Sequence, residues 1–196
     1  MKYFYSSSSE FYRFSVQDFP EELRQKIERR TLQKGEALFR EGDPADAIYF
    51  LDSGLVRLLN YTPSGKMVDH YLAMEGEFFA EVLMIMSVCT CTAIAETVSQ
   101  ILVIPKQDWL ETLKNHRSLA IAFAGALTYR LHWLKVIIQL RGIRAARERV
   151  WSYLQIVAAP NTRTITLDRP LKAIASELDI TPETLSRVLK QLTTEK

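Results

Sequence analysis

The stretch from Leu119 to Arg141 constrains the fold more than any other part of the chain. It has no proline and a single glycine, Gly125, and its apolar residues recur at alternating spacings of four and three. That spacing is the a/d seam of a coiled coil and predicts one long helix. A seam this apolar cannot face water over several turns, so we expect a parallel homodimer. The seam residues are Ala120, Ala124, Leu127, Leu131, Leu134 and Ile138.

A second stripe on the same stretch leaves another interpretation open. It runs at the same spacings and would also suit a helix buried in a monomeric core. Both can hold if the bulkier second stripe packs on a domain of its own chain while the seam pairs with its copy. The second stripe consists of Ala122, Ala126, Tyr129, Trp133, Val136 and Leu140.

Composition is that of a soluble globular protein, with 47% hydrophobic and 24% charged residues in a chain of 196. The net charge of +2 conceals an asymmetry. From Ile143 onward there are nine Lys/Arg against six Asp/Glu, whereas residues 1–142 hold sixteen against seventeen. A basic surplus confined to the C-terminal part is a mild indication of a polyanion-binding module.

Neither a membrane span nor a metal centre is expected from the sequence. The long apolar stretch is interrupted by Arg130, His132 and Lys135, and the N-terminus reads as a flexible, Ser-rich leader on a cytoplasmic protein. Cys89 and Cys91 are too few for a Cys-based metal or iron–sulfur site, and the simplest interpretation places them on one face of a strand. No cofactor is indicated.

The spacing of apolar residues along the chain changes twice before the long helix. Pro20–Arg30 is predicted to be a short helix. From Thr31 to Ile104, short β-type runs alternate with turn residues about every ten positions, and five of the seven glycines lie at those turns. This pattern predicts a compact antiparallel sandwich or barrel. Leu55–Tyr61 and Lys66–Ala73 should pair as a hairpin.

Three domains follow from the breaks along the chain. Gln107–Asn115 is a predicted short helix, the long helix begins near Arg117, and Gly142 should end it, because glycine is preferred just past a helix end. Helical spacing then resumes over Ile143–Val157. We therefore expect a leader and β domain over 1–116, a dimerisation helix over 117–142 and a C-terminal domain over 143–196, with Gly142 as the hinge.

The last segment predicts a helix-turn-helix. Leu171, Ile174, Ala175 and Leu178 form one apolar face, and Leu185, Val188, Leu189 and Leu192 form another. Thr181 is a natural N-cap and Pro182 suits the first helical position. Two short helices joined by a tight turn are the DNA-binding unit of many regulators.

The outward face of the second helix carries the residue types that read DNA. Arg187 can span O6 and N7 of a guanine, Glu183 can accept from a cytosine amino group, and Ser186 suits either. Lys172 and Lys190 would contact phosphates, with Thr181 beside them at the helix start. The simpler alternative for Glu183 and Arg187 is a surface ion pair.

These residues carry a family resemblance over nearly the whole chain. KGEALFREGDPADAIYFLDSGLVRL (Lys34–Leu58) and LKAIASELDITPETLSRVLKQL (Leu171–Leu192) resemble the Crp/Fnr family of bacterial transcription regulators. The resemblance implies an α+β protein with a β-roll of the jelly-roll type, a long dimerising helix and a winged helix-turn-helix. It also implies that Glu183, Ser186 and Arg187 form an E-x-x-S-R reading triplet, and that RNA polymerase is a partner.

Departures from the family pattern weaken the case for a cyclic nucleotide. Phe79-Ala80-Glu81 keeps the family's Glu for the ribose but loses the Gly of F-G-E, and Cys91-Thr92-Ala93 has Cys91 where an Arg meets the cyclic phosphate. Without that guanidinium a buried phosphate loses a bidentate contact. The positions that touch the adenine fall at Leu134 and Lys135. The implied pocket residues are Phe79, Glu81, Cys91, Thr92, Leu134 and Lys135.

The effector is therefore expected to be an unidentified small molecule, or the pocket is collapsed. The sequence also stops before the Gly and the two strands of the family's wing, so either the chain is trimmed or the wing's phosphate contacts are missing. Our prediction is a homodimeric, sequence-specific DNA-binding regulator of a palindromic site. The alternatives are a ligand-binding module without DNA activity and a true cyclic-nucleotide-responsive regulator. No catalytic constellation is visible, so an enzyme is not expected.

Overall fold

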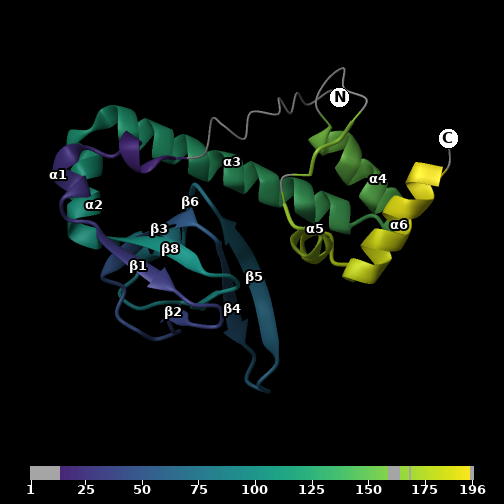
Figure 1. The fold of residues 1–196 in the computed structure, drawn as a ribbon, viewed down its shortest axis with the longest axis horizontal. Coiled ribbons are helices and arrows are strands. Elements are labelled where there is room, and N and C mark those ends of the chain that lie inside the picture. The colour runs from purple at the N-terminus through teal and green to yellow at the C-terminus, as the bar shows by residue number, and fades with distance from the viewer. Residues whose placement is uncertain (1–13, 159–163, 168, 195–196) are drawn as a thin grey trace. The chain divides into compact units, whose positions relative to one another are not determined.

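The computed structural model describes residues 14–158, 164–167 and 169–194, and the predicted leader lies outside them (Figure 1). The described chain forms two compact units, of which the first ends at Ala124 and the second begins at Gly125. The boundary falls inside one continuous helix, α3, which spans Arg117–Arg141.

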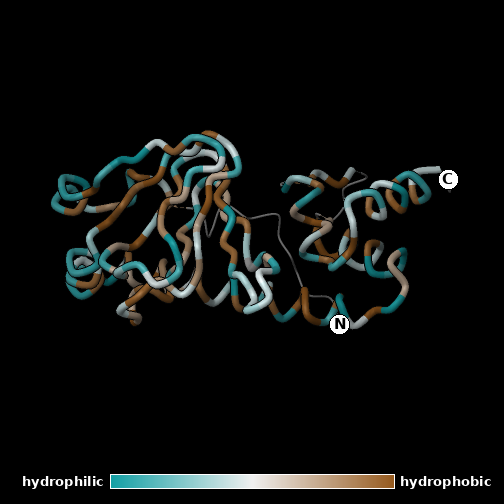
Figure 2. Tube along the Cα trace, turned by 90° about the horizontal axis from the view of Figure 1, so that it is seen from below, coloured by the Kyte–Doolittle hydropathy of each residue, from teal (hydrophilic) through white to brown (hydrophobic). Residues whose placement is uncertain are grey.

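The first unit contains two four-stranded antiparallel sheets, as the turn spacing predicts. Their strand orders are β1-β8-β3-β6 and β2-β7-β4-β5. Apolar stretches follow the strands and hydrophilic stretches mark the turns in the tube of Figure 2. The strands are β1 (Glu28–Leu32), β2 (Ala37–Phe39), β3 (Ala47–Ser53), β4 (Leu55–Tyr61), β5 (Met67–Met74), β6 (Glu77–Phe79), β7 (Thr92–Ala95) and β8 (Ser99–Pro105).

The predicted hairpin is present, with β4 pairing with β5 from Leu55↔Met74 to Tyr61↔Met67. All five turn glycines have positive φ, which an L side chain adopts only at a cost. Gly54 has a second reason to be glycine, because a Cβ there would collide with the side chain and backbone of Ser99.

The predicted helix over Pro20–Arg30 is wrong in its second half. Helix α1 covers only Glu21–Arg24, and β1 begins at Glu28. The segment that follows α1 finds a partner in β8, with Glu28 opposite Val103, so long-range strand pairing overrides the local helical pattern. Two 3-10 turns, η2 (Val16–Asp18) and η3 (Glu81–Met84), complete the unit together with α2 (Lys106–Asn115).

An aromatic cluster closes the core of the first unit against its helices. Trp109 of α2 is fully buried. Its ring lies 4.9 Å from that of Phe78 and 5.1 Å from that of Phe123, measured between centroids. Since Phe123 and Leu119 are both buried in this cluster, the first turns of α3 are part of the β domain's core.

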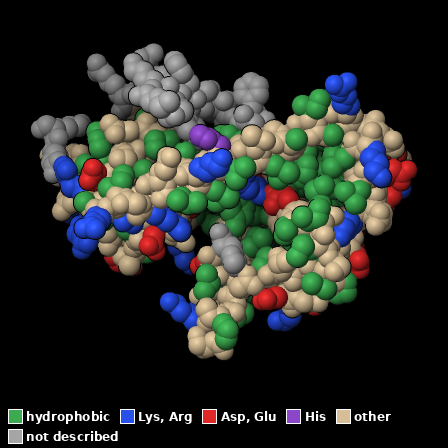
Figure 3. Space-filling model, turned by 180° about the vertical axis from the view of Figure 1, so that it is seen from behind, with side chains coloured by type: hydrophobic (Ala, Val, Ile, Leu, Met, Phe, Trp, Pro, Cys, Tyr) green, Lys and Arg blue, Asp and Glu red, His purple; other side chains and the backbone are tan. Residues whose placement is uncertain are grey.

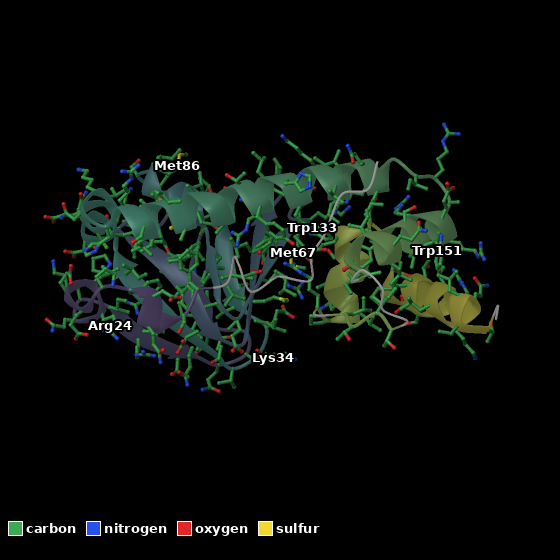
Figure 4. The ribbon with its side chains drawn as sticks, turned by 90° about the horizontal axis from the view of Figure 1, so that it is seen from above. Arg24, Lys34, Met67, Met86, Trp133 and Trp151 are labelled. Atoms are coloured by element: carbon green, nitrogen blue, oxygen red, sulfur yellow. The ribbon has the colours of Figure 1, made fainter. Side chains whose placement is uncertain are left out.

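The second unit is helical and is built on the C-terminal half of α3. Its helices are α4 (Ala146–Val157), α5 (Leu171–Glu177) and α6 (Pro182–Thr194). The predicted second stripe of α3 holds only there. Val136 and Leu140 are buried in this unit's core and the Trp133 ring packs edge-on against Tyr153, whereas Ala122 is exposed. Figure 4 labels Trp133 on α3.

By length and composition alone, α3 is the one helix within the described residues that is long and apolar enough to cross a membrane. This is weak evidence. Both ends of the helix contribute buried residues to folded cores, Leu119 and Phe123 to one and Ile137 and Leu140 to the other.

Candidate nucleic-acid interface

The turn between α5 and α6 is a Schellman motif centred on Asp179. Asp179 has a φ of 53°, a left-handed conformation that Asp tolerates better than most residues. Its N–H donates to the carbonyl of Ser176 at 3.1 Å, and the N–H of Ile180 donates to that of Ala175 at 3.0 Å. These two bonds define the motif, and they fix the path of the chain from one helix to the next.

Helix α6 begins at the predicted N-cap. The N–H of Thr184 donates to Oγ1 of Thr181 at 3.2 Å. Leu185 and Val188 are buried against α4 and α5, with Leu189 and Leu192 packed beside them. The opposite face of α6 is open, and its exposed residues include Glu183, Ser186, Arg187 and Lys190. Lys172, near the start of α5, is exposed as well.

The simple ion pair between Glu183 and Arg187 does not form within the described residues. The Glu183 carboxylate instead accepts from its own backbone N–H and from Thr181, and both bonds lower the pKa of Glu183. The guanidinium of Arg187 donates to Oγ1 of Thr184 at 3.4 Å. Glu183 is thus held ionised as an acceptor, and Arg187 is not engaged by it.

The predicted seam is exposed along α3. Ala120 is partly covered and Ala124 is exposed. The larger side chains stay accessible, with exposed fractions of 37% at Leu127, 54% at Leu131, 47% at Leu134 and 68% at Ile138. Hydrophobic side chains are plainly visible at the surface in Figure 3. A row of exposed Leu and Ile on one helix face is what a partner surface requires.

The interior of the β domain is filled by aromatic rings at the predicted effector site. Phe79 is fully buried and stacks on Tyr49 with 5.7 Å between centroids, and Tyr49 stacks on Phe39 at 4.9 Å. Burial raises the pKa of Tyr49 to about 12. Ala80, where the family pattern has glycine, has φ 55° and ψ 36°, and Glu81 follows it half-buried at the start of η3.

Cys91 and Thr92 immediately precede Ala93, which pairs with Phe39 of the aromatic stack. Thr92 is buried and its Oγ1 accepts from the N–H of Glu41 at 3.1 Å. Burial raises the pKa of the Cys91 thiol, with the charges of Cys89 and Glu41 adding to the effect. A neutral thiol beside a carboxylate cannot replace the arginine that would meet a cyclic phosphate.

Two expectations about this region change. Cys89 and Cys91 do not lie in a strand, because β7 begins only at Thr92, and both are buried in the core before it. The pocket roles of Leu134 and Lys135 remain predictions, since both belong to the second unit, where they are exposed.

Sequence reasoning missed two arginines that hold the helix-turn-helix. Arg141, at the end of α3, and Arg149, on α4, donate to backbone carbonyls of residues 176–179. The acceptors are main-chain atoms, which every residue type provides, so no sequence signal identified these contacts.

Known proteins match this arrangement. The family model of the cyclic nucleotide-binding domain matches residues 29–116, a stretch that ends immediately before α3. The global nitrogen regulator of Synechocystis sp. is 27% identical over 171 residues, which cover 83% of this chain and 76% of that protein.

Solved structures agree over a similar length. The crystal structure of DNR from Pseudomonas aeruginosa is 31% identical, with a TM-score of 0.53 over 89% of this chain and 79% of that one. FixK2 from Bradyrhizobium japonicum is 21% identical and shares the fold, with a TM-score of 0.64 over 86% of this chain and 85% of that one.

Proposed function

The chain belongs to the Crp/Fnr family of bacterial transcription regulators, and on that premise we propose that it is a homodimeric regulator that binds a palindromic promoter site. In the proposal each subunit reads one half-site with α6. The protein acts in the cytoplasm, and RNA polymerase is its partner at the promoter, as the family implies.

One observation carries the proposal, namely the two-sided character of α6. Its buried side fixes the helix through Leu185 and Val188, and its other side presents a carboxylate acceptor and a guanidinium donor in the first two turns. In a helix-turn-helix those turns meet base edges in the major groove. Arg187 would bind a guanine through O6 and N7, and Glu183 would accept from a cytosine amino group.

Dimerisation through the α3 seam supplies a second copy of α6, and we call the helix-turn-helix that carries α6 the reading head of each subunit. Each subunit's seam is apolar and accessible from Leu127 to Ile138. A two-fold dimer places its reading helices about one turn of DNA apart, which is why the proposed site is a palindrome.

We propose that the β domain does not respond to a cyclic nucleotide. The aromatic stack of Phe39, Tyr49 and Phe79 occupies the interior, and Cys91 offers a protonated thiol instead of a cation. The rival, a cyclic-nucleotide-responsive regulator, draws support from the family model that matches residues 29–116 and from the retained Glu81. Thermal unfolding with and without cAMP and cGMP separates the two. A concentration-dependent rise in Tm would favour the rival.

The DNA proposal is tested by gel shift on a palindrome that the wild-type protein selects from a random duplex library. Arg187→Ala should lower affinity about tenfold or more and relax the preference at one base pair of each half-site. Lys190→Ala should weaken binding to all sequences alike and reduce the salt dependence of binding.

Arg144→Ala is the matched control, because it removes an exposed arginine of the same unit that is not on α6. Equal base preference in Arg187→Ala and wild type would refute base reading by this residue. Failure of the wild type to select any sequence would favour the ligand-binding module without DNA activity.

A further inference from the structure

We propose that Arg141 is the positioning residue that couples the dimer seam to the reading head, and that it thereby sets the half-site spacing the dimer accepts. This inference rests on the proposed DNA-binding function. It assigns to one side chain a task that neither the seam nor the reading helix performs alone.

Arg141 joins the two parts directly. It is the last residue of α3, one turn beyond the seam residue Ile138. Its Nε donates to the carbonyl of Glu177 at 2.8 Å and its Nη2 to that of Ser176 at 3.1 Å. A planar guanidinium that binds two acceptors at once fixes an angle as well as a distance. The cation also lies at the C-terminal end of α5, where the helix dipole favours positive charge.

Arg149 braces the same turn from α4. Its Nη1 donates to the carbonyls of Leu178 at 2.6 Å and Asp179 at 3.3 Å. Its Nε and Nη2 both donate to the carbonyl of Ile143, at 3.0 and 2.7 Å. With the two Schellman bonds, every carbonyl from 175 to 179 then has a donor, and those of Glu177, Leu178 and Asp179 accept from an arginine.

Loss of Arg149 and loss of Arg141 should affect the fold differently. The contacts of Arg149 with Ile143 and Leu178 are partly buried and tie three segments together, so its loss would disturb the fold. Arg141 is exposed, and the Schellman bonds hold the turn without it. Arg141 can therefore be removed to ask about orientation without unfolding the helix-turn-helix.

The contacts of Arg141 also bear on the predicted hinge. Gly142 follows Arg141 at the end of α3, but it does not have positive φ, and its N–H donates to the carbonyls of Ile138 and Gln139. Bending at Gly142 would have to break the two bonds of Arg141 to α5. While these two hydrogen bonds are intact, a rotation of α3 about its axis must also move α5. Because the turn between α5 and α6 is rigid, α6 then moves with α5.

The test uses the full-length dimer and its selected palindrome, with the two half-sites moved apart or together by one and two base pairs. Wild type should bind the native spacing at least about tenfold better than any altered spacing. Arg141→Ala should bind the native spacing more weakly and bind all spacings within a few-fold of one another. Its preference at each base of the half-site should be unchanged, because α6 still reads it.

Two controls make the result specific. Arg141→Lys keeps the charge but cannot bridge two carbonyls with a planar fork, so it should behave like the Ala variant. Arg144→Ala should keep the wild-type spacing profile. Circular dichroism of each variant verifies that α5 and α6 are folded.

The outcomes separate the two proposals. If wild type selects no DNA sequence, the proposed function fails and this inference fails with it. If wild type binds but Arg141→Ala keeps its spacing profile, only the coupling role is refuted. Rescue of the profile by Lys would also refute it, because charge rather than the two-carbonyl contact would then be responsible.

Discussion

Ala80 has a backbone conformation that few residues with a Cβ adopt. Its φ of 55° and ψ of 36° place it in the left-handed region, immediately before η3. For an L-residue other than Gly, Asn or Asp this costs free energy, because Cβ approaches the following carbonyl oxygen. The strain is tolerated because the residues on both sides are held, Phe79 in the aromatic stack and Leu83 in the core.

Replacing Ala80 by glycine should therefore stabilise the protein. We expect Ala80→Gly to raise the free energy of unfolding by about 1 kcal/mol, measured by urea denaturation. The same substitution at Ala73, a buried residue of β5 with ordinary φ, serves as control and should destabilise by about 1 kcal/mol or more. A loss of stability in Ala80→Gly would show that the left-handed backbone is not strained.

Burial of three weak acids predicts a loss of stability at alkaline pH. Burial raises the pKa of Cys89 and Cys91 above the ordinary 9.0, and raises that of Tyr49 from 10.0 to about 12. These groups ionise more readily in the unfolded chain. Their contribution is therefore complete below pH 9 and is lost as the pH rises towards the folded-state pKa values.

The urea midpoint should accordingly fall between pH 8 and about pH 10.5. Tyr49→Phe removes the hydroxyl but keeps the ring, so its midpoint should fall less steeply above pH 10 than that of wild type. Parallel declines in the two proteins would mean that Tyr49 does not contribute. The buried thiols should also react slowly with a thiol reagent at pH 8 in the folded protein.

At the scale of elements, α6 depends on the cap at its start as well as on its buried face. The Thr181 hydroxyl satisfies the N–H of Thr184, one of the four donors that a helix start leaves without partners. We expect Thr181→Ala to reduce the free energy of unfolding by about 1 kcal/mol, measured by urea denaturation. Thr181→Ser keeps the hydroxyl and should restore most of it. An unchanged midpoint in the Ala variant would contradict the capping role.

Helix α3 packs into different cores at its two ends. Its first turns bury Leu119 and Phe123 in the core of the β domain, and its last turns bury Val136, Ile137 and Leu140 in the helical core. Between and beside these contacts, the seam stays exposed. A single buried stripe does not describe this helix, because its first turns and its last turns belong to the cores of two different units.

At the scale of the whole molecule, the seam predicts how the protein assembles. Leu131→Lys places a charge in the middle of the seam of both copies, next to Arg130 and near Lys135. Removing two leucines from the interface costs about 4 kcal/mol, which is about a thousandfold in the dissociation constant. We expect a monomer in sedimentation velocity at micromolar concentration, where our proposal requires the wild type to be a dimer.

Gln139→Lys provides the matched control for this experiment. Gln139 is exposed on the same helix and lies outside the seam, so the added charge should leave the dimer intact. A dimer that survives Leu131→Lys would mean that the copies meet through another surface. A monomeric wild type would remove the basis for a palindromic site.

Much of the architecture was predictable from local patterns. The a/d spacing located α3, the turn glycines located the hairpin of β4 and β5, and the two apolar faces with Thr181 located the helix-turn-helix. Each of these patterns is formed by residues that are close together in the chain, so it can be recognised from the sequence alone. The segment after α1 was mispredicted because its partner, β8, is distant in the chain.

The sequence by itself determined which helix faces are apolar and which residues α6 can offer to DNA, because side-chain chemistry and helical period are local properties. Only the tertiary structure decided that Phe39, Tyr49 and Phe79 stack where an effector was expected, and that Arg141 and Arg149 donate to carbonyls at the turn before α6. Those arrangements join distant segments, and the arginines bind backbone carbonyls. A carbonyl is the same atom in every residue, so its position, and not its sequence, makes it a partner.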